Sequence, residues 1–271
     1  MSERWLLPPL WFDLCWEIGG FDEHPFPISV RSHGETLEER AAIRQRTVPE
    51  LQKAGLLAQS GLTQRFAEVL GQLAKPGLWI EGLWMPDETT DSPFRLLSVA
   101  TEQGALLLVQ QSGETENYGG DLRISVLPRT SVGAAAVQGM PPAPVGKRPR
   151  LAVPAADVAV QKSSDDFENI DHMQSSGPRK APAAEALRNF VEAPHHRDGQ
   201  FTANLRDRFG RTHRSAVLKW FDAPEPDGRY GLTQAQRPGL GPELVLAGLG
   251  APQLTSALEN RVAEVRALAK S

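Results

Sequence analysis

The residues that could do chemistry in this sequence are few and widely scattered. His195 and His196, followed by Asp198, could supply ligands for a metal ion. Adjacent residues in a loop seldom converge on one ion, and the other histidines show no ligand spacing, so a solvated loop is the favoured interpretation. Cys15 lies in an apolar stretch without a neighbouring His or Lys that would lower the pKa of its thiol. We therefore expect Cys15 to be a small buried hydrophobic residue rather than a nucleophile.

The sequence lacks the common motifs of catalysis and cofactor binding. It contains no G-x-S-x-G, H-E-x-x-H, C-x-x-C or G-x-x-x-x-G-K-S/T pattern. The glycine pairs at 239–241 and 248–250 lack the third glycine and the context of a phosphate-binding loop, which indicates turns. The carboxylate pairs at 38–39 and 165–166 fit solvated positions better than acid–base catalysis. We expect no enzyme activity, no cofactor and no metal site.

Four arginines surround one predicted turn: Arg206, Arg208, Arg211 and Arg214. Within the turn, Asp207 offsets part of their charge. Such a cluster could bind nucleic acid, but general nucleic-acid binding normally requires a basic excess, whereas this chain has 29 Lys and Arg against 33 Asp and Glu. A solvated tip or an electrostatic attachment point for an acidic partner is the favoured interpretation. No nucleic-acid partner is expected.

The segment 200–208 alternates between apolar and polar residues, as a strand does when its two faces meet different environments. One face carries Phe201, Ala203 and Leu205. The other face carries Thr202, Asn204, Arg206 and Arg208. We expect the apolar side to join the core and the polar side to be open. In a chain without catalytic motifs, this polar face is a candidate docking surface, with a plain solvated face as the alternative.

Two helices are predicted before the first strands. A capping box at 36–39 begins the first helix, and Gly55 lies where its C-terminal cap belongs. Pro49 removes a backbone amide from this helical pattern, so we expect a kink or two helices there. The second helix should run over 63–74. Its expected core residues are Phe66, Val69, Leu70 and Leu73.

Eight strand-like segments follow in two groups of four. In the first half they are 78–85, 94–100, 105–112 and 122–128. In the second half they are 200–209, 215–222, 228–235 and 243–250. A helix follows each group: Thr130 or Ser131 can cap the first one. The second one places Leu254, Leu258, Val262, Val265 and Leu268 on one face. This order favours an α+β fold with antiparallel strands, and an offset of roughly 120 residues indicates a duplicated half-domain.

The predicted organisation is one globular unit made of two similar halves, 1–140 and 141–271. The length of 271 residues allows one large domain or two small ones packed together. The polar segment 161–182 has little hydrophobic periodicity, so we expect a mobile insertion there. A single cysteine fits a reducing cytosol, and no segment approaches the length of a membrane span. We expect a soluble, cytoplasmic protein that begins at Met1 and is a monomer or a weak dimer.

Several sequence blocks in a fixed order resemble the EspG family of actinobacteria, which is associated with ESX (type VII) secretion. In the first half these blocks are TLEERAA (36–42) with its continuation to AGL (54–56), and LPRT (127–130). In the second half they are GQF (199–201), RFGR (208–211), WFD (220–222) and DGRY (227–230). The match runs from about Trp11 to Leu268 and includes the spacing between the blocks. Their order carries the resemblance.

This resemblance implies an α+β fold of two similar subdomains around an antiparallel β-sheet flanked by helical bundles. It implies a cytosolic specificity chaperone that binds PE–PPE heterodimers at the helical tip of the PPE protein and keeps them soluble for export. The family docks its client on sheet-face and C-terminal helical residues, here from 200–208, 215–222 and the helix that begins near Pro252. The expected client-binding residues are Thr202, Asn204, Arg206, Arg208, Lys219 and Phe221. The alternative is a non-catalytic protein-binding or regulatory module unrelated to secretion.

Overall fold

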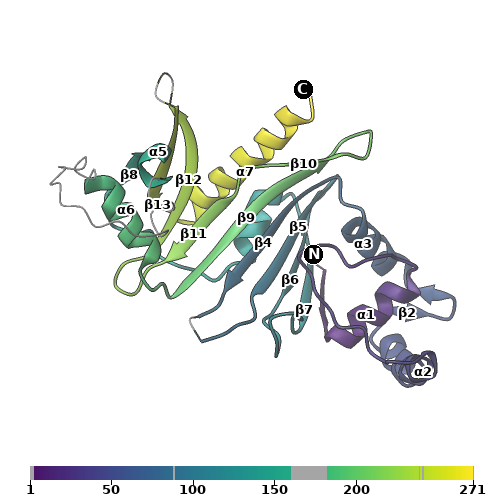
Figure 1. The fold of residues 1–271 in the computed structure, drawn as a ribbon. Coiled ribbons are helices and arrows are strands. Elements are labelled where there is room, and N and C mark those ends of the chain that lie inside the picture. Colours follow the sequence, from purple (N-terminus) through teal and green to yellow (C-terminus); the bar gives the residue numbers. More distant parts are fainter. Residues whose placement is uncertain (1–2, 88, 160–181, 238, 240, 271) are drawn as a thin grey trace, which may run out of the picture.

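The computed structural model describes residues 3–87, 89–159, 182–237, 239 and 241–270 (Figure 1). The helices are α1 (Pro9–Ile18), α2 (Leu37–Lys53), α3 (Gln64–Ala74), α4 (Val132–Gln138), α5 (Ala155–Ala159), α6 (Pro182–Glu192) and α7 (Ala251–Leu268). The first-half strands are β1 (Arg4–Leu7), β2 (Leu57–Ala58), β3 (Gly61–Leu62), β4 (Leu78–Met85), β5 (Phe94–Thr101), β6 (Gly104–Gln110) and β7 (Leu122–Pro128). The second-half strands are β8 (Leu151–Pro154), β9 (Arg197–Arg206), β10 (Thr212–Arg214), β11 (Leu218–Asp222), β12 (Arg229–Arg237) and β13 (Gly241–Gly248).

One antiparallel sheet crosses the whole molecule (Figure 1). Its strand order is β1-β7-β6-β5-β4-β9-β11-β12-β13-β8, and β10 also pairs with β9. The two halves of the chain meet where β4 pairs with β9, from Leu78 opposite Leu205 to Met85 opposite Asp198. Outward from this pair, each half forms a meander whose edge is closed by a short strand, β1 on one side and β8 on the other. β2 and β3 form a separate small hairpin.

Helices cover the two faces of this sheet unevenly. We call the side of Trp79 the first face and the side of Ile80 the second face. On the first face, α1 and α3 pack on the first-half strands, with α2 outside them against α1 and β2, and α6 packs on the outer strands of the second half. On the second face, α4 and α7 lie together over the middle of the sheet. The buried apolar residues form three core clusters: the first, under α1 and α3, contains Phe66 and Leu97; the second, under α4 and α7, contains Ile80 and Leu258; the third, under α6, contains Phe190 and Tyr230. The middle of the first face, along β4 and β9, therefore lies between two helical layers (Figure 1).

The predicted elements are largely confirmed. α3 buries the four residues expected of the helix over 63–74, and all eight strand segments contain strands. Ser131 caps α4, because its hydroxyl accepts a hydrogen bond from the amide of Ala134. α7 buries Leu254, Leu258, Val262 and Val265. Leu268, which was expected on the same buried face, is 42% exposed at the end of the helix.

The helix around Pro49 excludes one of the two predicted alternatives. Thr36 caps α2 as expected, since its hydroxyl accepts a hydrogen bond from the Glu39 amide at 3.1 Å. The expectation of two helices is wrong, because α2 runs without interruption from Leu37 to Lys53 with Pro49 inside it. Pro49 removes one helical hydrogen bond near the end of α2, which the rest of the helix tolerates. Gly55 then ends the helix with a φ of 72°, a conformation that glycine adopts without strain.

The predicted boundary between residues 140 and 141 falls in the connection from α4 to β8. Each half has a helix on the first face, then a meander, then a helix on the second face. This order fits the expected duplication, which stays a prediction. Residues 161–181 of the expected insertion lie outside the described residues, and Pro182 begins α6.

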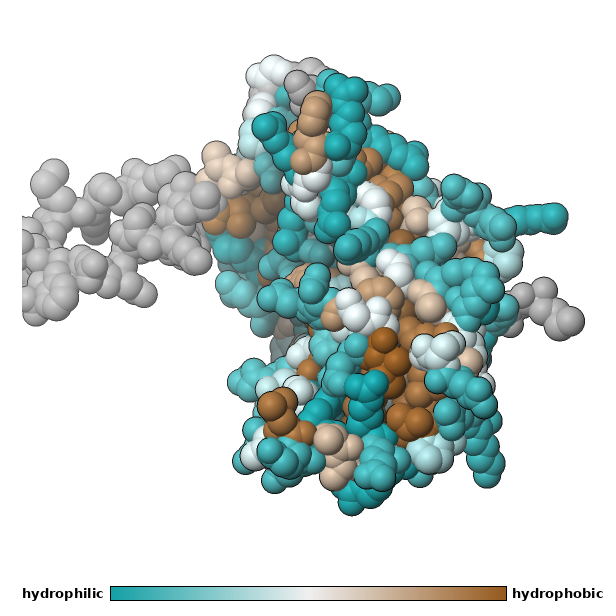
Figure 2. All heavy atoms as spheres, turned by 90° about the vertical axis from the view of Figure 1, so that its right-hand side faces the viewer, coloured by the Kyte–Doolittle hydropathy of each residue, from teal (hydrophilic) through white to brown (hydrophobic). Residues whose placement is uncertain are grey.

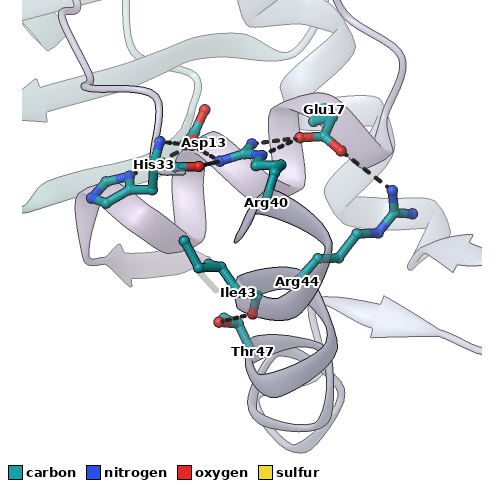
Figure 3. Close-up of polar contacts among 7 residues, drawn as sticks. All are labelled: Asp13, Glu17, His33, Arg40, Ile43, Arg44 and Thr47. Atoms are coloured by element: carbon teal, nitrogen blue, oxygen red, sulfur yellow. Dashed lines mark hydrogen bonds and ion pairs between the residues drawn. The ribbon is translucent and has the colours of Figure 1, made fainter. Parts of the chain in front are cut away.

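α2 is attached to α1 mainly by charged side chains, because most residues of α2 are exposed. The guanidinium of Arg40 binds two carboxylates of α1, Asp13 and Glu17, with Nε 2.7 Å from Glu17 Oε2. Arg44 lies 3.3 Å from the other oxygen of Glu17 (Figure 3). Asp13 is 6% exposed, so its charge depends on Arg40 for compensation. This network fixes α2 where apolar packing is sparse.

We call α1, α2, α3 and the hairpin of β2 and β3 the N-terminal lobe. Its surface mixes hydrophilic and hydrophobic side chains. Figure 2 shows the side of the molecule that lies on the right in Figure 1. Hydrophilic residues dominate this view, and hydrophobic ones gather in its lower half, at the level of α1 and α2. Several apolar side chains of this lobe are partly buried against the first core cluster: Leu10, Trp11, Ile18, Phe21, Ile43, Val48 and Leu62. Among the described residues, no helix combines the length and the apolar character needed to cross a bilayer.

Candidate binding surface on the central strands

The uncovered middle of the first face carries mostly polar side chains. We call it the central strip and define it by the side chains that alternation and strand register place there. They are Glu81, Leu83, Gln200, Thr202, Asn204 and Lys219. Three strands supply them, because Glu81 lies opposite Thr202 on the neighbouring strand, and Gln200 lies opposite Lys219. The strip is therefore built from both halves of the chain.

A shallow hollow lies within the central strip, and a loop residue stands at its edge. Its lining residues are Phe26, Glu81, Gly82, Leu83, Gln200, Thr202 and Arg214. Phe26 comes from the loop between α1 and α2 and is 60% exposed. An exposed aromatic ring beside polar strand residues gives the hollow an apolar contact and several hydrogen-bonding groups. Such a mixture is typical of protein-binding surfaces.

Glu81 is the charged centre of the strip. Its side chain is 9% exposed and forms an ion pair with Arg214 at 2.5 Å. Burial raises the pKa of the Glu81 carboxyl, while Arg214 and hydrogen bonds from Trp79 and Asn204 oppose that rise. Arg214 is itself 56% exposed, so the ion pair joins the buried carboxylate of Glu81 to a side chain at the surface.

The structure brings together four of the six expected client-binding residues and separates two. Thr202, Asn204 and Lys219 belong to the central strip, and Arg206 continues the same face, with its guanidinium 5.9 Å from the centre of the Trp79 ring. The expectation that the polar face of 200–208 is open holds for Arg206 and Arg208, which are exposed. It is wrong for Thr202 and Asn204, which are each 2% exposed.

The other two expected residues lie elsewhere. Arg208 follows the end of β9 at Arg206, so the alternation of the strand no longer decides where it points. Phe221 is on the first face but is 6% exposed, because it packs beneath α6 with its ring centre 5.8 Å from that of Phe190. Phe221 is therefore part of the third core cluster and lies beneath the surface of the first face.

The residues considered for catalysis or metal binding do not converge. The His195 ring packs beside Phe190 and Phe221, with ring centres 5.2 and 4.7 Å apart. In the part of the chain that the structure describes, no group of three or more His, Cys, Asp or Glu side chains could hold a metal ion. Cys15 is fully buried, as expected, and burial raises the pKa of its thiol to about 12. A thiol with that pKa is a poor nucleophile at neutral pH.

A comparison with protein families decides the relationship that the sequence blocks suggested. A model of the EspG family matches residues 8–260. The chain belongs to the EspG family. The predicted family resemblance is thus confirmed, and it covers both helical layers and nearly the whole sheet. No curated protein matches this EspG family member.

Among solved structures, this EspG family member is similar to the type VII secretion system chaperone EspG5 of Mycobacterium tuberculosis, solved in complex with the PE25–PPE41 dimer. The two chains share 13% sequence identity, with a TM-score of 0.60, and the match covers 95% of each chain. This likeness concerns the fold. It confirms the predicted α+β architecture around a large antiparallel sheet.

Of the residues that line the hollow, the sequence analysis named only Thr202 as a binding residue, and three of the missed ones show why. Phe26 lies in a loop, where no periodicity marks it. Glu81 stands inside a strongly apolar segment, and this lone carboxylate within 78–85 was the signal that could have identified it. Arg214 was noted as part of the arginine cluster, but its pairing with Glu81 depends on the sheet order and could not be read from either segment.

Proposed function

We propose that this protein is a non-enzymatic, cytosolic chaperone of type VII (ESX) secretion that binds a PE–PPE pair at the helical tip of the PPE protein. The observation that carries the proposal is the central strip, a part of the sheet that none of the described helices covers, in a fold shared with EspG5. EspG5 is a chaperone solved with a PE25–PPE41 dimer, and family membership brings that role to this chain as a proposal.

The position of the central strip suits a helical client. The strip lies between the layer of α1, α2 and α3 and the layer of α6 (Figure 1), and this is where we place the tip of a helical hairpin. A helical hairpin awaiting export exposes an apolar tip, and covering that tip prevents self-association. Phe26 and Leu83 offer apolar contact for it.

The composition of the central strip suits a reversible complex. Gln200 and Lys219 are exposed and polar, and the buried Glu81 already has a partner in Arg214. A surface that mixes apolar and polar contacts, without a large apolar core, favours release at the secretion apparatus over permanent association. We therefore place Phe26, Arg206 and Lys219 at the contact with the client.

Co-expression tests this function. The protein should be produced together with the PE–PPE pair encoded nearest in its native genome, and the mixture analysed by size-exclusion chromatography. We expect the wild type to form a complex. Phe26→Ser should weaken association by about tenfold or more, because exposed aromatic residues often dominate binding energy. Lys219→Glu should weaken it by about threefold, as expected of a partly solvated charge.

Phe209→Ser is the matched control, because Phe209 is also a largely exposed phenylalanine, 72% exposed against 60% for Phe26, at the turn after β9 and outside the central strip. This variant should bind the client like the wild type. If the wild type forms no complex with any neighbouring type VII substrate, the chaperone proposal is rejected, and an unrelated binding module becomes the better interpretation. If Phe26→Ser and Lys219→Glu bind normally, only the proposed surface is rejected.

A further inference from the structure

The turn between β9 and β10 is held rigidly by one carboxylate. Asp207 accepts hydrogen bonds from the amides of Phe209 at 2.8 Å and Arg211 at 2.9 Å, and it lies 3.0 Å from Nε2 of His213. All three interactions lie within the hairpin. The hydrogen bond with His213 is the main reason why the pKa of Asp207 is lowered. The carboxylate of Asp207 is therefore held in place within the turn, where its single charge offsets only part of the charge of the surrounding arginines.

This rigid turn presents an aromatic ring and cationic groups to solvent. Phe209 is 72% exposed, and the Arg208 guanidinium lies 4.7 Å from the centre of its ring. Exposed single phenylalanines are common on protein surfaces, but a phenylalanine on a fixed turn, stacked with an arginine, loses little conformational entropy when it binds a partner.

A groove lies between this hairpin and the C-terminal end of α7. We call it the basic groove and define it by Leu205, Arg206, Arg208, Arg211, Leu268 and Lys270. Its walls carry three arginines and a lysine, all exposed, and the two leucines add apolar surface. Glu264 lies nearby on α7, but its carboxylate accepts a hydrogen bond from the Ala216 amide at 2.9 Å and pairs with Arg261 at 2.6 Å. Asp207 also lines the groove and offsets one of its four cationic side chains, so the groove keeps a net positive charge.

The basic groove is distinct from the central strip, although Arg206 lies at the border between them. Leu205 packs with the second core cluster, on the face that α7 covers, whereas the strip lies on the first face. In Figure 1 the hairpin that contains β10 and the end of α7 lie together at the top, away from α2 at the lower right. A client on the central strip that reaches Arg206 would therefore still leave Arg208, Arg211 and Lys270 accessible.

We propose that the basic groove binds an extended acidic peptide segment of a second protein partner, with carboxylates against Arg208, Arg211 and Lys270 and one apolar side chain against Phe209 and Leu268. Charge complementarity carries this choice, because the groove is cationic in a chain whose net charge is −4. An anionic membrane fits less well, since a flat surface touches the turn but does not enter the groove. Nucleic acid fits less well, because the aromatic contact is a single ring and the whole chain is acidic.

The proposal is tested with a short fluorescein-labelled peptide of glutamates around one leucine, measured by fluorescence anisotropy with the full chain. A peptide with glutamines in place of the glutamates is the control probe. The acidic peptide should bind better than the glutamine peptide, and binding should weaken as salt is raised. The double variant Arg208→Ser/Arg211→Ser should bind it at least about fivefold more weakly. Phe209→Ser should also weaken binding, whereas Phe26→Ser should not.

Arg46→Ser/Lys53→Ser is the matched charge control, because it removes the same charge from exposed positions on α2 at a distance from the hairpin. This variant should bind the acidic peptide like the wild type. Circular dichroism should show all variants folded, since the changed side chains are exposed. Equal binding of both peptides, or equal losses in the two double variants, overturns the proposal. Groove-dependent binding to duplex DNA or to phosphatidylserine vesicles, without binding to the acidic peptide, also overturns it.

The outcome is independent of the client experiment. Arg208→Ser/Arg211→Ser should still form the complex with the PE–PPE pair, and Phe26→Ser should still bind the acidic peptide. If the double variant loses the client as well, the groove belongs to the client surface and the separate-partner proposal fails. If no PE–PPE complex forms at all but the peptide results hold, the groove proposal survives while the chaperone proposal does not.

Discussion

Glu81 shows how one buried carboxylate makes the central strip sensitive to pH. Burial raises its pKa above the usual value of 4.5, and Arg214 limits that rise. A raised pKa means that the folded state holds the proton of Glu81 at pH values where the unfolded state has released it. The stability that Glu81 contributes is therefore greatest below pH 4.5 and falls as pH rises through its folded pKa.

Replacing Glu81 tests this dependence. Glu81→Gln should reduce the loss of unfolding free energy between pH 4.5 and neutral pH, because the ionisable group is gone. Arg214→Gln should do the opposite and steepen that loss, since Arg214 favours the charged form of Glu81. Urea unfolding at several pH values, followed by tryptophan fluorescence, measures both effects. Equal pH slopes in the wild type and in Glu81→Gln would contradict the explanation.

For single residues, the alternation of apolar and polar side chains in β9 predicted the correct face of the sheet, but it did not predict how exposed each side chain is. The period of two in β9 placed Phe201 in the core and Thr202 on the opposite face, as the structure has them. It could not reveal that Thr202 is nearly inaccessible, because its neighbours Glu81 and Arg214 come from other strands. Phe26 contributes to the same hollow from a loop that precedes Glu81 by more than fifty residues, and no local pattern connects them.

α2 shows how an element with few apolar contacts is held in place. Arg40→Ala should lower the free energy of unfolding by about 3 kcal/mol, because the buried Asp13 would lose its charged partner. Urea denaturation followed by tryptophan fluorescence measures this change. The expected cost comes from an uncompensated buried charge more than from the lost attraction itself.

Arg44→Ala is the control within the same helix. Arg44 is 49% exposed, and its partner Glu17 is 40% exposed, so the loss should be less than about 1 kcal/mol. Comparable losses in both variants would show that the network acts as one unit and that the burial of Asp13 does not decide the cost. If neither Arg40→Ala nor Arg44→Ala lowers the free energy of unfolding, α2 contributes little to global stability.

The predictability of the elements follows their length and their place in the sheet. β4 was predicted with its observed bounds, because eight residues rich in apolar side chains form a central strand. β1 and β8, each four residues long, were missed, since short edge strands carry little pattern. α6 begins directly after the polar segment and was missed despite its apolar stripe of Ala184, Leu187 and Phe190.

The whole molecule is held together by a core that both halves share. The second core cluster combines Ile80 and Leu96 from the first half with Phe201 and Leu258 from the second. Glu259 of α7 also accepts a hydrogen bond from the amide of Gly133 in α4 at 2.9 Å. Because neither half can bury these residues alone, we expect the two halves to unfold together although the sequence predicts them as similar units.

Cys15 provides a probe for this cooperativity. Its thiol is buried in the first core cluster, with a pKa of about 12, so it should react with a thiol reagent only after unfolding. Leu258→Ala opens a cavity in the second half, where Leu258 is fully buried, and should lower the free energy of unfolding by about 2 to 5 kcal/mol. If the halves unfold together, labelling of Cys15 should accelerate by at least about 25-fold.

A second leucine separates cooperative unfolding from a local effect. Leu37 is 86% exposed at the start of α2, in the same lobe as Cys15, so Leu37→Ala should leave the labelling rate unchanged. Labelling that stays slow in Leu258→Ala, while circular dichroism shows an early loss of structure, would mean that the N-terminal lobe remains folded by itself. In that case the shared sheet would join two separately stable units where β4 pairs with β9.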